Sequence, residues 1–299
     1  MSGDSPWSLR FYQAVNASEL ARRLELTEAL AWTELHQGQS LATKQALGVA
    51  VRHYGSATAL FTSGIDELAV NRVIGVGLDA GDYDAGLHQI ISDYRAAGCR
   101  RMLVQIAPVS ANAARVQGAL RDWGPREVRP TVKLYRRATP ECPAGMIESS
   151  IQVVQIDAAS ARLFEQTVAR ELGIPAPLRS MTASTAGHPN WRHYLAFANG
   201  TPIAGAALYT HDDTAWFGLA ATLPHARGRG AQSALLVKRI HDAFDAGCTW
   251  VTADTLAETL QSPNTSLRNM RRLGFEIAYE RANHLLDLTA QPAQRFNDC

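Results

Sequence analysis

The hydrophobic pattern is strongest in the second half of the chain, between residues 215 and 247. An apolar run from 215 to 223 ends at Pro224, which is typical of a buried strand and the exit from it. A short turn of arginine and glycine follows at 227–230. Beyond the turn, apolar or small residues share one helical face at Leu236, Ile240, Ala243, Phe244 and Gly247. The segment therefore predicts a strand, a glycine turn and a helix.

The remaining pattern predicts alternating helices and strands. Helices are expected at 19–35, at 41–54, at 158–172 and around an apolar face made by Leu87, Ile90, Ile91 and Tyr94. Strands are expected at 72–77, 101–106, 131–135, 151–156, 193–198, 202–209, 250–254 and 276–279. Asn199-Gly200 predicts a hairpin turn, and a second turn is expected near 211–213. The polar segment 175–190, which contains prolines and a glycine, predicts a loop.

The two halves of the chain repeat one order of elements. Ala97-Gly98-Cys99 precedes one strand, and Ala246-Gly247-Cys248 precedes another, 149 residues later. Helical segments then end at Gly124 and Gly274, which are 150 residues apart. The shared spacing favours duplication of one α/β unit over a chance match of tripeptides. We expect a first domain at 1–138, a linker at 139–148 and a second domain at 149–299.

Composition narrows the class of protein. The 299 residues are 46% hydrophobic and 19% charged, as in globular proteins, and the net charge of +1 argues against a general binder of nucleic acid or anionic membranes. The four cysteines form no C-x-x-C pair, so neither a zinc site nor a redox motif is expected, and sparse cysteines without a pattern are typical of a reducing cytosol. The start lacks the pattern of a signal peptide, and no apolar run is long enough to span a membrane. These features predict a cytoplasmic protein.

The strand, glycine turn and helix have the physical properties of an anion site. Glycines let the backbone approach a phosphate closely, and the first turn of a helix offers unpaired N–H groups at the positive end of its dipole. Arg227 and Arg229 add positive charge. The turn lacks the Gly-Lys-Ser/Thr of a nucleotide-binding loop, which disfavours a nucleotide-binding module.

In this context the turn resembles the acetyl-CoA loop of the GNAT superfamily of N-acetyltransferases, Gln/Arg-x-x-Gly-x-Gly/Ala. Arg227 and Gly230 match this pattern, whereas Gln232 replaces its last small residue with a side chain that could crowd the pyrophosphate. The resemblance covers about 150–288. It implies an α/β (α+β) fold of two GNAT-like domains, each with a mixed, mostly antiparallel central sheet flanked by helices. It also implies acetyl-CoA as co-substrate and no metal. In the family the region that corresponds to 175–190 covers the acceptor, so the resemblance makes this loop a candidate lid, with a plain connector as the alternative.

The resemblance assigns roles to residues. The cofactor-binding residues it implies are Ala220, Ala221, Thr222, Arg227, Gly228, Arg229, Gly230, Ala231, Gln232, Ser233, Asn264 and Asn269. Asp254 is the first candidate for the base that deprotonates the amine, and Glu258 is the second, although either carboxylate could equally be a solvated or capping group. Asn264 could instead be a helix N-cap.

The acid that protonates the leaving thiolate is missing from its usual place. Many relatives carry a tyrosine four residues before the Gly-Phe, and Met270 stands there. Ser266, one turn earlier, could hydrogen-bond the CoA arm.

The first half lacks the arginines of the turn. At an offset of 149, Arg227 and Arg229 correspond to Leu78 and Ala80, while Gly230 corresponds to Gly81. Acidic residues crowd the segment at Asp79, Asp82 and Asp84 and would repel a pyrophosphate. The first domain is therefore expected to be degenerate, with a role in the core, the substrate cleft or a dimer.

These features together predict an N-acetyltransferase that moves an acetyl group from acetyl-CoA to a primary amine of a small molecule, peptide or protein. A homodimer is an open alternative for its assembly. No nucleic-acid or membrane partner is expected. The alternative is a non-catalytic acyl-CoA-binding or regulatory protein, which the methionine at 270 keeps open.

Overall fold

The structure is a computed structural model that describes residues 17–79, 83–110, 112–142 and 151–289. Several residues used above lie outside the described part of the chain. They are Ala80, Gly81 and Asp82 of the first-half turn, the side chain of Asp84, linker residues 143–148, and Cys299, one of the four cysteines.

The first half contains α1 (Ala17–Gln37), α2 (Leu41–Leu47), β1 (Val49–Tyr54), β2 (Ala57–Thr62), β3 (Arg72–Ile74), α3 (Tyr83–Ala96), β4 (Arg101–Ile106), α4 (Ala113–Arg121) and β5 (Arg126–Arg137). The second half contains β6 (Ile151–Ile156), η1 (Ala158–Ser160), α5 (Ala161–Val168), η2 (Ala176–Ala183), β7 (Trp191–Ala198), β8 (Thr201–His211), β9 (Thr214–Thr222), η3 (Pro224–Ala226), α6 (Ala231–Asp245), β10 (Trp250–Leu256), α7 (Thr265–Arg272) and β11 (Glu276–Asp287). The predicted mixed α/β fold, with a mostly antiparallel sheet flanked by helices, is confirmed.

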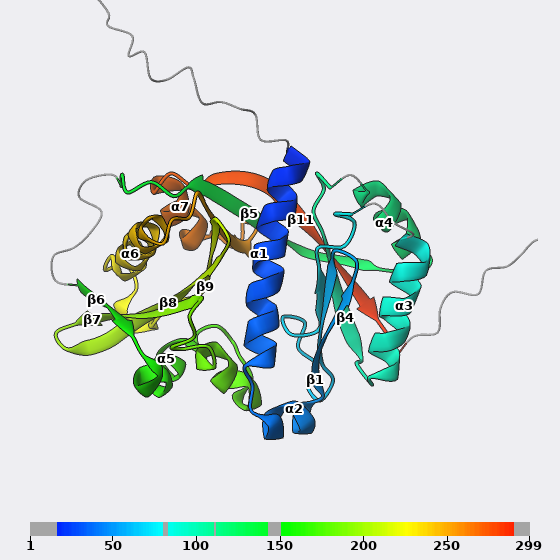
Figure 1. The fold of residues 1–299 in the computed structure, drawn as a ribbon, viewed down its shortest axis with the longest axis horizontal. Coiled ribbons are helices and arrows are strands. Elements are labelled where there is room, and N and C mark those ends of the chain that lie inside the picture. The colour runs from blue at the N-terminus through cyan, green and yellow to red at the C-terminus, as the bar shows by residue number, and fades with distance from the viewer. Residues whose placement is uncertain (1–16, 80–82, 111, 143–150, 290–299) are drawn as a thin grey trace, which may run out of the picture.

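The strands of both halves join in one sheet, ordered β1-β2-β3-β4-β11-β5-β10-β9-β8-β7-β6 (Figure 1). Each half gives its last strand to the other half. β5 pairs with β10 of the second half, and β11 pairs with β4 of the first half, so β5 and β11 lie side by side at the centre. Among the described strands, β3–β4 and β9–β10 are the parallel pairs. The exchange joins the two halves through backbone hydrogen bonds.

The repeated order of elements is present in three dimensions. The series β1-β2-β3-α3-β4-α4-β5 has the same order as β7-β8-β9-α6-β10-α7-β11. Both α3 and α6 end in a glycine with positive φ, 82° at Gly98 and 79° at Gly247. The next residues, Cys99 and Cys248, each donate a backbone N–H to a carbonyl five residues earlier, at 3.0 Å. Two identical helix endings at one offset support the duplication.

Three local predictions differ from the structure. The helix expected over 41–54 ends at Leu47, because Gly48 adopts φ 60° and closes it, and 49–54 forms β1. Phe244, expected on the buried face of α6, is 45% exposed. The loop expected at 175–190 contains η2, whose Leu178 and Met181 are each 1% exposed and pack in the core, so this part is not an open lid.

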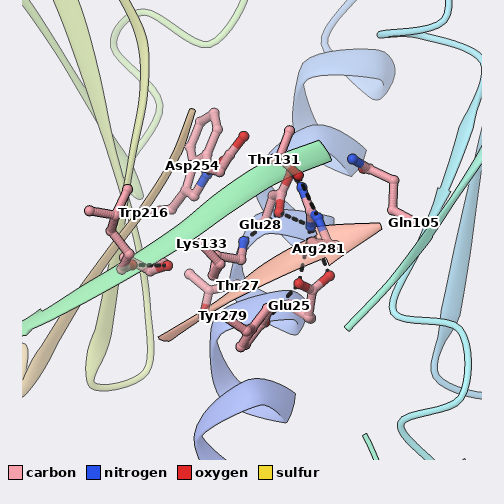
Figure 2. A network of polar contacts seen from close by, with 12 residues as sticks. Glu25, Thr27, Glu28, Gln105, Thr131, Lys133, Trp216, Asp254, Tyr279 and Arg281 are labelled. Carbon is pink, nitrogen blue, oxygen red and sulfur yellow. Dashed lines mark hydrogen bonds and ion pairs between the residues drawn. The ribbon is translucent and has the colours of Figure 1, made fainter. Parts of the chain in front are cut away.

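Helix α1 crosses the middle of the molecule and carries two buried carboxylates, Glu25 and Glu28 (Figures 1 and 2). Glu28 accepts from Lys133 of β5 at 2.5 Å and from Arg281 of β11 at 2.6 Å, and it lies 3.3 Å from Arg72 of β3. Arg281 also pairs with Glu25 at 2.9 Å. Burial alone would raise the pKa of Glu28, but the three cations outweigh burial and lower it well below its usual range. This ion cluster ties α1 to the exchanged strands.

None of the helices within the described ranges is both long enough and apolar enough to cross a membrane.

Candidate functional site

The sheet opens between β9 and β10. The two strands pair in parallel from Thr214–Phe217 on β9 to Trp250–Ala253 on β10, and the pairing stops there. Beyond this point 218–222 pairs only with β8, while 254–256 pairs only with β5. A register shift in the β8–β9 pairing and a positive φ of 49° at Leu219 mark a bulge at the opening. The edge of 218–222 that faces β10 therefore has backbone groups free for a ligand.

A cavity of about 790 Å³ extends from this opening to the start of α6. Ten of the twelve predicted cofactor residues line it: Ala220, Ala221, Thr222, Arg227, Gly228, Gly230, Ala231, Gln232, Ser233 and Asn269. The predicted residues thus gather around one space large enough for a cofactor-sized ligand.

The turn at the end of the cavity has the geometry of an anion site. Gly228 and Gly230 have φ of 77° and 79°, which other residues rarely adopt. Gly230 precedes α6, and no side chain caps the first amides of that helix. Arg227 donates to Glu171 at 2.9 Å and to the carbonyl of Thr222 at 3.3 Å, and its side chain is 63% exposed. Free amides, a helix dipole and this guanidinium surround the end of the cavity.

A second cavity of about 350 Å³ adjoins the first, since Ala220, Gln232 and Arg239 line both. Asp254 lies in its wall, half-buried, and its Oδ1 accepts from Trp216 Nε1 at 3.2 Å (Figure 2). Ser266 also lines this cavity. The first-choice base thus lies beside the opening in the sheet.

Comparisons with known proteins agree with this geometry. The family model described as "Acetyltransferase (GNAT) family" matches residues 159–275. A GCN5-related N-acetyltransferase from Kribbella flavida superposes with a TM-score of 0.62 at 16% identity, covering 90% of this chain and 95% of that chain. One from Sphaerobacter thermophilus gives 0.56 at 17%, with coverage of 91% and 93%. A tandem GNAT protein from the clavulanic acid biosynthesis pathway gives 0.54 at 13%, with coverage of 91% and 95%. No curated protein matches the chain.

Residues 159–275 form a GNAT domain. The structural neighbours share the fold over both halves of the chain, which extends the likeness beyond the segment that the family model matches.

Two predicted cofactor residues of the GNAT domain lie away from the cavity. Arg229 is exposed and does not line it. Asn264 is the N-cap of α7, and its side chain accepts from the backbone amide of Leu267 at 3.0 Å. The alternative prediction for Asn264, a helix N-cap, is confirmed. Arg239 on α6 and Arg272 on α7, which sequence reasoning missed, also line the cavity and add two cations to Arg227.

Gln232, the departure from the GNAT pattern, turns toward α7. Its side-chain amide donates to Ser266 at 2.8 Å and accepts from Asn269 at 2.7 Å, and Asn269 in turn accepts from Arg272. The glutamine therefore links α6 to α7 across the site, and its amide is tied to α7 instead of the glycine turn.

Of the other two candidate positions of the GNAT domain, one lies on the surface and one lines the second cavity. Glu258 is exposed, pairs with Arg268 at 3.2 Å and lines neither cavity, so its carboxylate is a surface group. Met270 is 3% exposed and lines the second cavity, with no proton to donate. Within the described ranges no cluster of His, Cys, Asp and Glu is arranged to hold a metal ion.

The first half contributes to the second cavity of the GNAT domain. Trp32 of α1 and Ala69, which precedes β3, lie in its wall. Trp32 contacts Trp216 edge to face, with ring centroids 6.3 Å apart. No pattern in the sequence indicated this contribution, because it depends on how α1 packs across both halves.

In the first half, the segment that corresponds to this opening is shorter, and neighbouring groups occupy the space beside it. Thirteen residues, 218–230, separate the last parallel-paired residue of β9 from α6, but only nine, 74–82, separate that of β3 from α3. A Cβ added at Gly75 would lie 2.7 Å from the carbonyl of Ser56. Arg72 donates to Gln105 at 3.0 Å, in the place where Trp216 donates to Asp254.

Proposed function

We propose that this protein is an N-acetyltransferase that moves an acetyl group from acetyl-CoA to a primary amine of a small molecule or peptide. The observation that carries the proposal is the end of β9–β10 pairing at Phe217 and Ala253, which opens a cavity running to the glycine turn of α6. A diphosphate would lie against the amides of 228–233, and the pantetheine arm would bond to the free edge of 218–222.

In this proposal Asp254 removes the proton of the acceptor ammonium, whose pKa in free solution is about 10. The neutral nitrogen then forms a bond to the thioester carbonyl carbon, and the carbon–sulfur bond breaks to release CoA thiolate. Backbone N–H groups near the bulge at Leu219 polarise the carbonyl oxygen. The nitrogen gives its second proton to water as the amide forms, and the thiolate takes a proton from water, because Met270 stands where a tyrosine would donate it. Trp216 orients Asp254 by its hydrogen bond.

The second candidate function is a non-catalytic acyl-CoA-binding protein. The buried Met270 at the position of the usual acid favours it. The two functions share the cofactor cavity and differ only in whether acyl transfer takes place.

Two measurements separate these functions. Thermal melting with CoA, acetyl-CoA and ATP tests the cavity, and we expect stabilisation by the two CoA species alone. Thiol release against a panel of amines then tests catalysis, with Asp254→Asn as the inactive control. Binding without thiol release in any amine would leave the binder as the function. Equal stabilisation by ATP would contradict both.

The first half, in this proposal, binds no CoA and completes the acceptor cavity through Trp32. Its Asp79 pairs with Arg22 at 3.4 Å and would face any phosphate placed at that turn. The free cysteines Cys99, Cys142 and Cys248 support a cytoplasmic location. A homodimer remains a prediction that size measurement in solution would test.

A further inference from the structure

Arg239 is a buried cation on the face of α6 that packs against the sheet. The residue is 2% exposed, and its neighbours Leu235, Leu236 and Ile240 are all buried. Its guanidinium lies 4.5 Å from the centre of the Phe217 ring. An arginine at such a position loses nearly all of its hydration, which is costly unless other groups replace the water.

The protein replaces only part of that hydration. Nε donates to the carbonyl of Leu235 and Nη1 to the carbonyl of Ala207, both at 3.1 Å. Among the described residues, no hydrogen-bond acceptor meets Nη2, and no carboxylate lies within 4 Å of the guanidinium. Burial lowers the pKa of Arg239 to about 9, so it still carries its charge near neutral pH.

The other buried cations of the described chain have either a counter-charge or a larger set of hydrogen bonds, although Nε and Nη2 of Arg72 lack a hydrogen-bond acceptor. Arg72, Lys133 and Arg281 each lie within 4 Å of Glu28. Arg136 donates to five oxygen atoms, four of them backbone carbonyls. Arg239 has two carbonyls and no counter-charge, which is the arrangement of a cation that awaits an anionic ligand.

The position of Arg239 identifies which part of a ligand it would meet. It lines both cavities, at the place where they join. Ala207, which holds Nη1, is paired with Gly218, the first residue beyond the separation of β9 from β10. Along α6 its Cα lies about 13 Å from Gly230. The guanidinium is therefore at the reacting end of the site, and the diphosphate turn is at the other end.

We propose that Arg239 binds a carboxylate that one of the two reactants carries to the reacting end of the site. The inference rests on the proposed function and adds a substrate class to it. One source is an acceptor that is an amino acid. The other is an acyl group with a terminal carboxylate, such as succinyl.

The second cavity matches an amino acid in charge and in surface. Asp254 offers a carboxylate for the ammonium group, and Arg239 offers a guanidinium for the carboxylate. Much of the remaining wall is apolar, including Trp32, Trp216 and Ile174. A volume of about 350 Å³ suits a small molecule with an apolar side chain. Arg239 is equally well placed to bind a carboxylate on the acyl group, because the residue also lines the larger cavity.

Matched pairs of substrates test the inference on the wild-type chain. In the acceptor arm, kcat/KM is compared for phenylalanine against 2-phenylethylamine and for leucine against 3-methylbutylamine. In the donor arm, succinyl-CoA is compared with acetyl-CoA. We expect one arm to favour the carboxylate-bearing member by about 30-fold or more in kcat/KM. With the other member, the buried charge of Arg239 would stay unpaired.

Variants locate the effect at Arg239. Arg239→Gln should remove the preference while leaving CoA affinity and the melting temperature of the CoA complex close to wild type. Arg239→Lys should retain part of the preference, because it keeps the charge but loses the fork of donors. Arg121→Gln, an exposed arginine of α4 outside both cavities, is the matched control and should change nothing.

The inference is overturned if the carboxylate-free member is used equally well in both arms. It is also overturned if Arg239→Gln slows every substrate alike, since that result would give Arg239 a structural role in holding α6 to β8. Both outcomes leave the proposed function standing, because CoA would still stabilise the protein. Absence of any stabilisation by CoA would instead refute the proposed function, and this inference with it.

Discussion

The ion cluster beneath the sheet provides a quantitative test of how the two halves are joined. Glu28→Gln removes one of two carboxylates that face Arg72, Lys133 and Arg281, all of them buried. The variant leaves three cations with Glu25, which pairs with Arg281, and with the more distant charge of Asp254, which acts on Arg72 and Arg281. Removing one partner of a buried ion pair costs about 3–5 kcal/mol, because the remaining charge stays desolvated. At about 2–4 °C per kcal/mol for a chain of this size, the melting temperature should fall by about 6–20 °C.

Calorimetry and urea unfolding measure this loss. Glu280→Gln is the matched control, because Glu280 is an exposed carboxylate beside Arg281 on β11, and it should change stability by no more than about 0.5 kcal/mol. Adding Lys133→Met to Glu28→Gln removes a cation as well. The double variant should therefore lose less free energy of unfolding than the two single variants lose in sum.

The loss must also depend on pH. The folded-state pKa of Glu28 lies below its unfolded value, so the carboxylate stabilises the fold at neutral pH and loses this contribution as the pH falls below about 4.5. The difference in stability between wild type and Glu28→Gln should therefore be constant from pH 7 to about pH 5 and shrink steadily from about pH 4.5 to pH 3. A loss smaller than about 1 kcal/mol at pH 7, or a difference that is constant with pH, would refute the assigned electrostatics.

Three further variants test the site. Asp254→Asn should lower kcat for thiol release by about 100-fold or more with unchanged CoA affinity, and full activity would remove Asp254 as the base. Gly218→Ala places a Cβ 1.8 Å from the Trp216 ring, so the indole must move and its hydrogen bond to Asp254 must break. We expect a free energy of unfolding lower by about 1–3 kcal/mol and slower turnover. An unaltered melting curve would contradict the packing. Arg227→Ala should weaken CoA binding several-fold in titration calorimetry, whereas an affinity equal to wild type would exclude Arg227 from the anion site.

Local features of the site were predictable from sequence because their causes are local. A glycine turn between a strand and a helix requires positive φ, and Gly228 and Gly230 show it. The hairpin at Asn199-Gly200 follows from the same chemistry, with φ of 49° and 74°. Conversely, the apolar period over 41–54 fits a helix and a strand equally poorly, and one glycine at 48 decides the boundary.

Long-range features were not predictable in this way. The pattern of 131–135 and 276–279 predicts strands but does not say which half of the chain they join, and the strands that contain them, β5 and β11, each pair with the other half. Trp32 and Arg239 enter the site through packing between elements far apart in sequence. The periodicity of α1 likewise does not reveal why Glu25 and Glu28 are buried, because their partners are on β5 and β11.

The account depends most on the place of the diphosphate, and a crystal structure of the chain with bound CoA tests it directly. We expect one CoA per chain, with its diphosphate against the amides of 228–233 and its pantetheine arm along 218–222. A diphosphate bound at 75–79 of the first half, or a pantetheine arm outside the opening between β9 and β10, would contradict it.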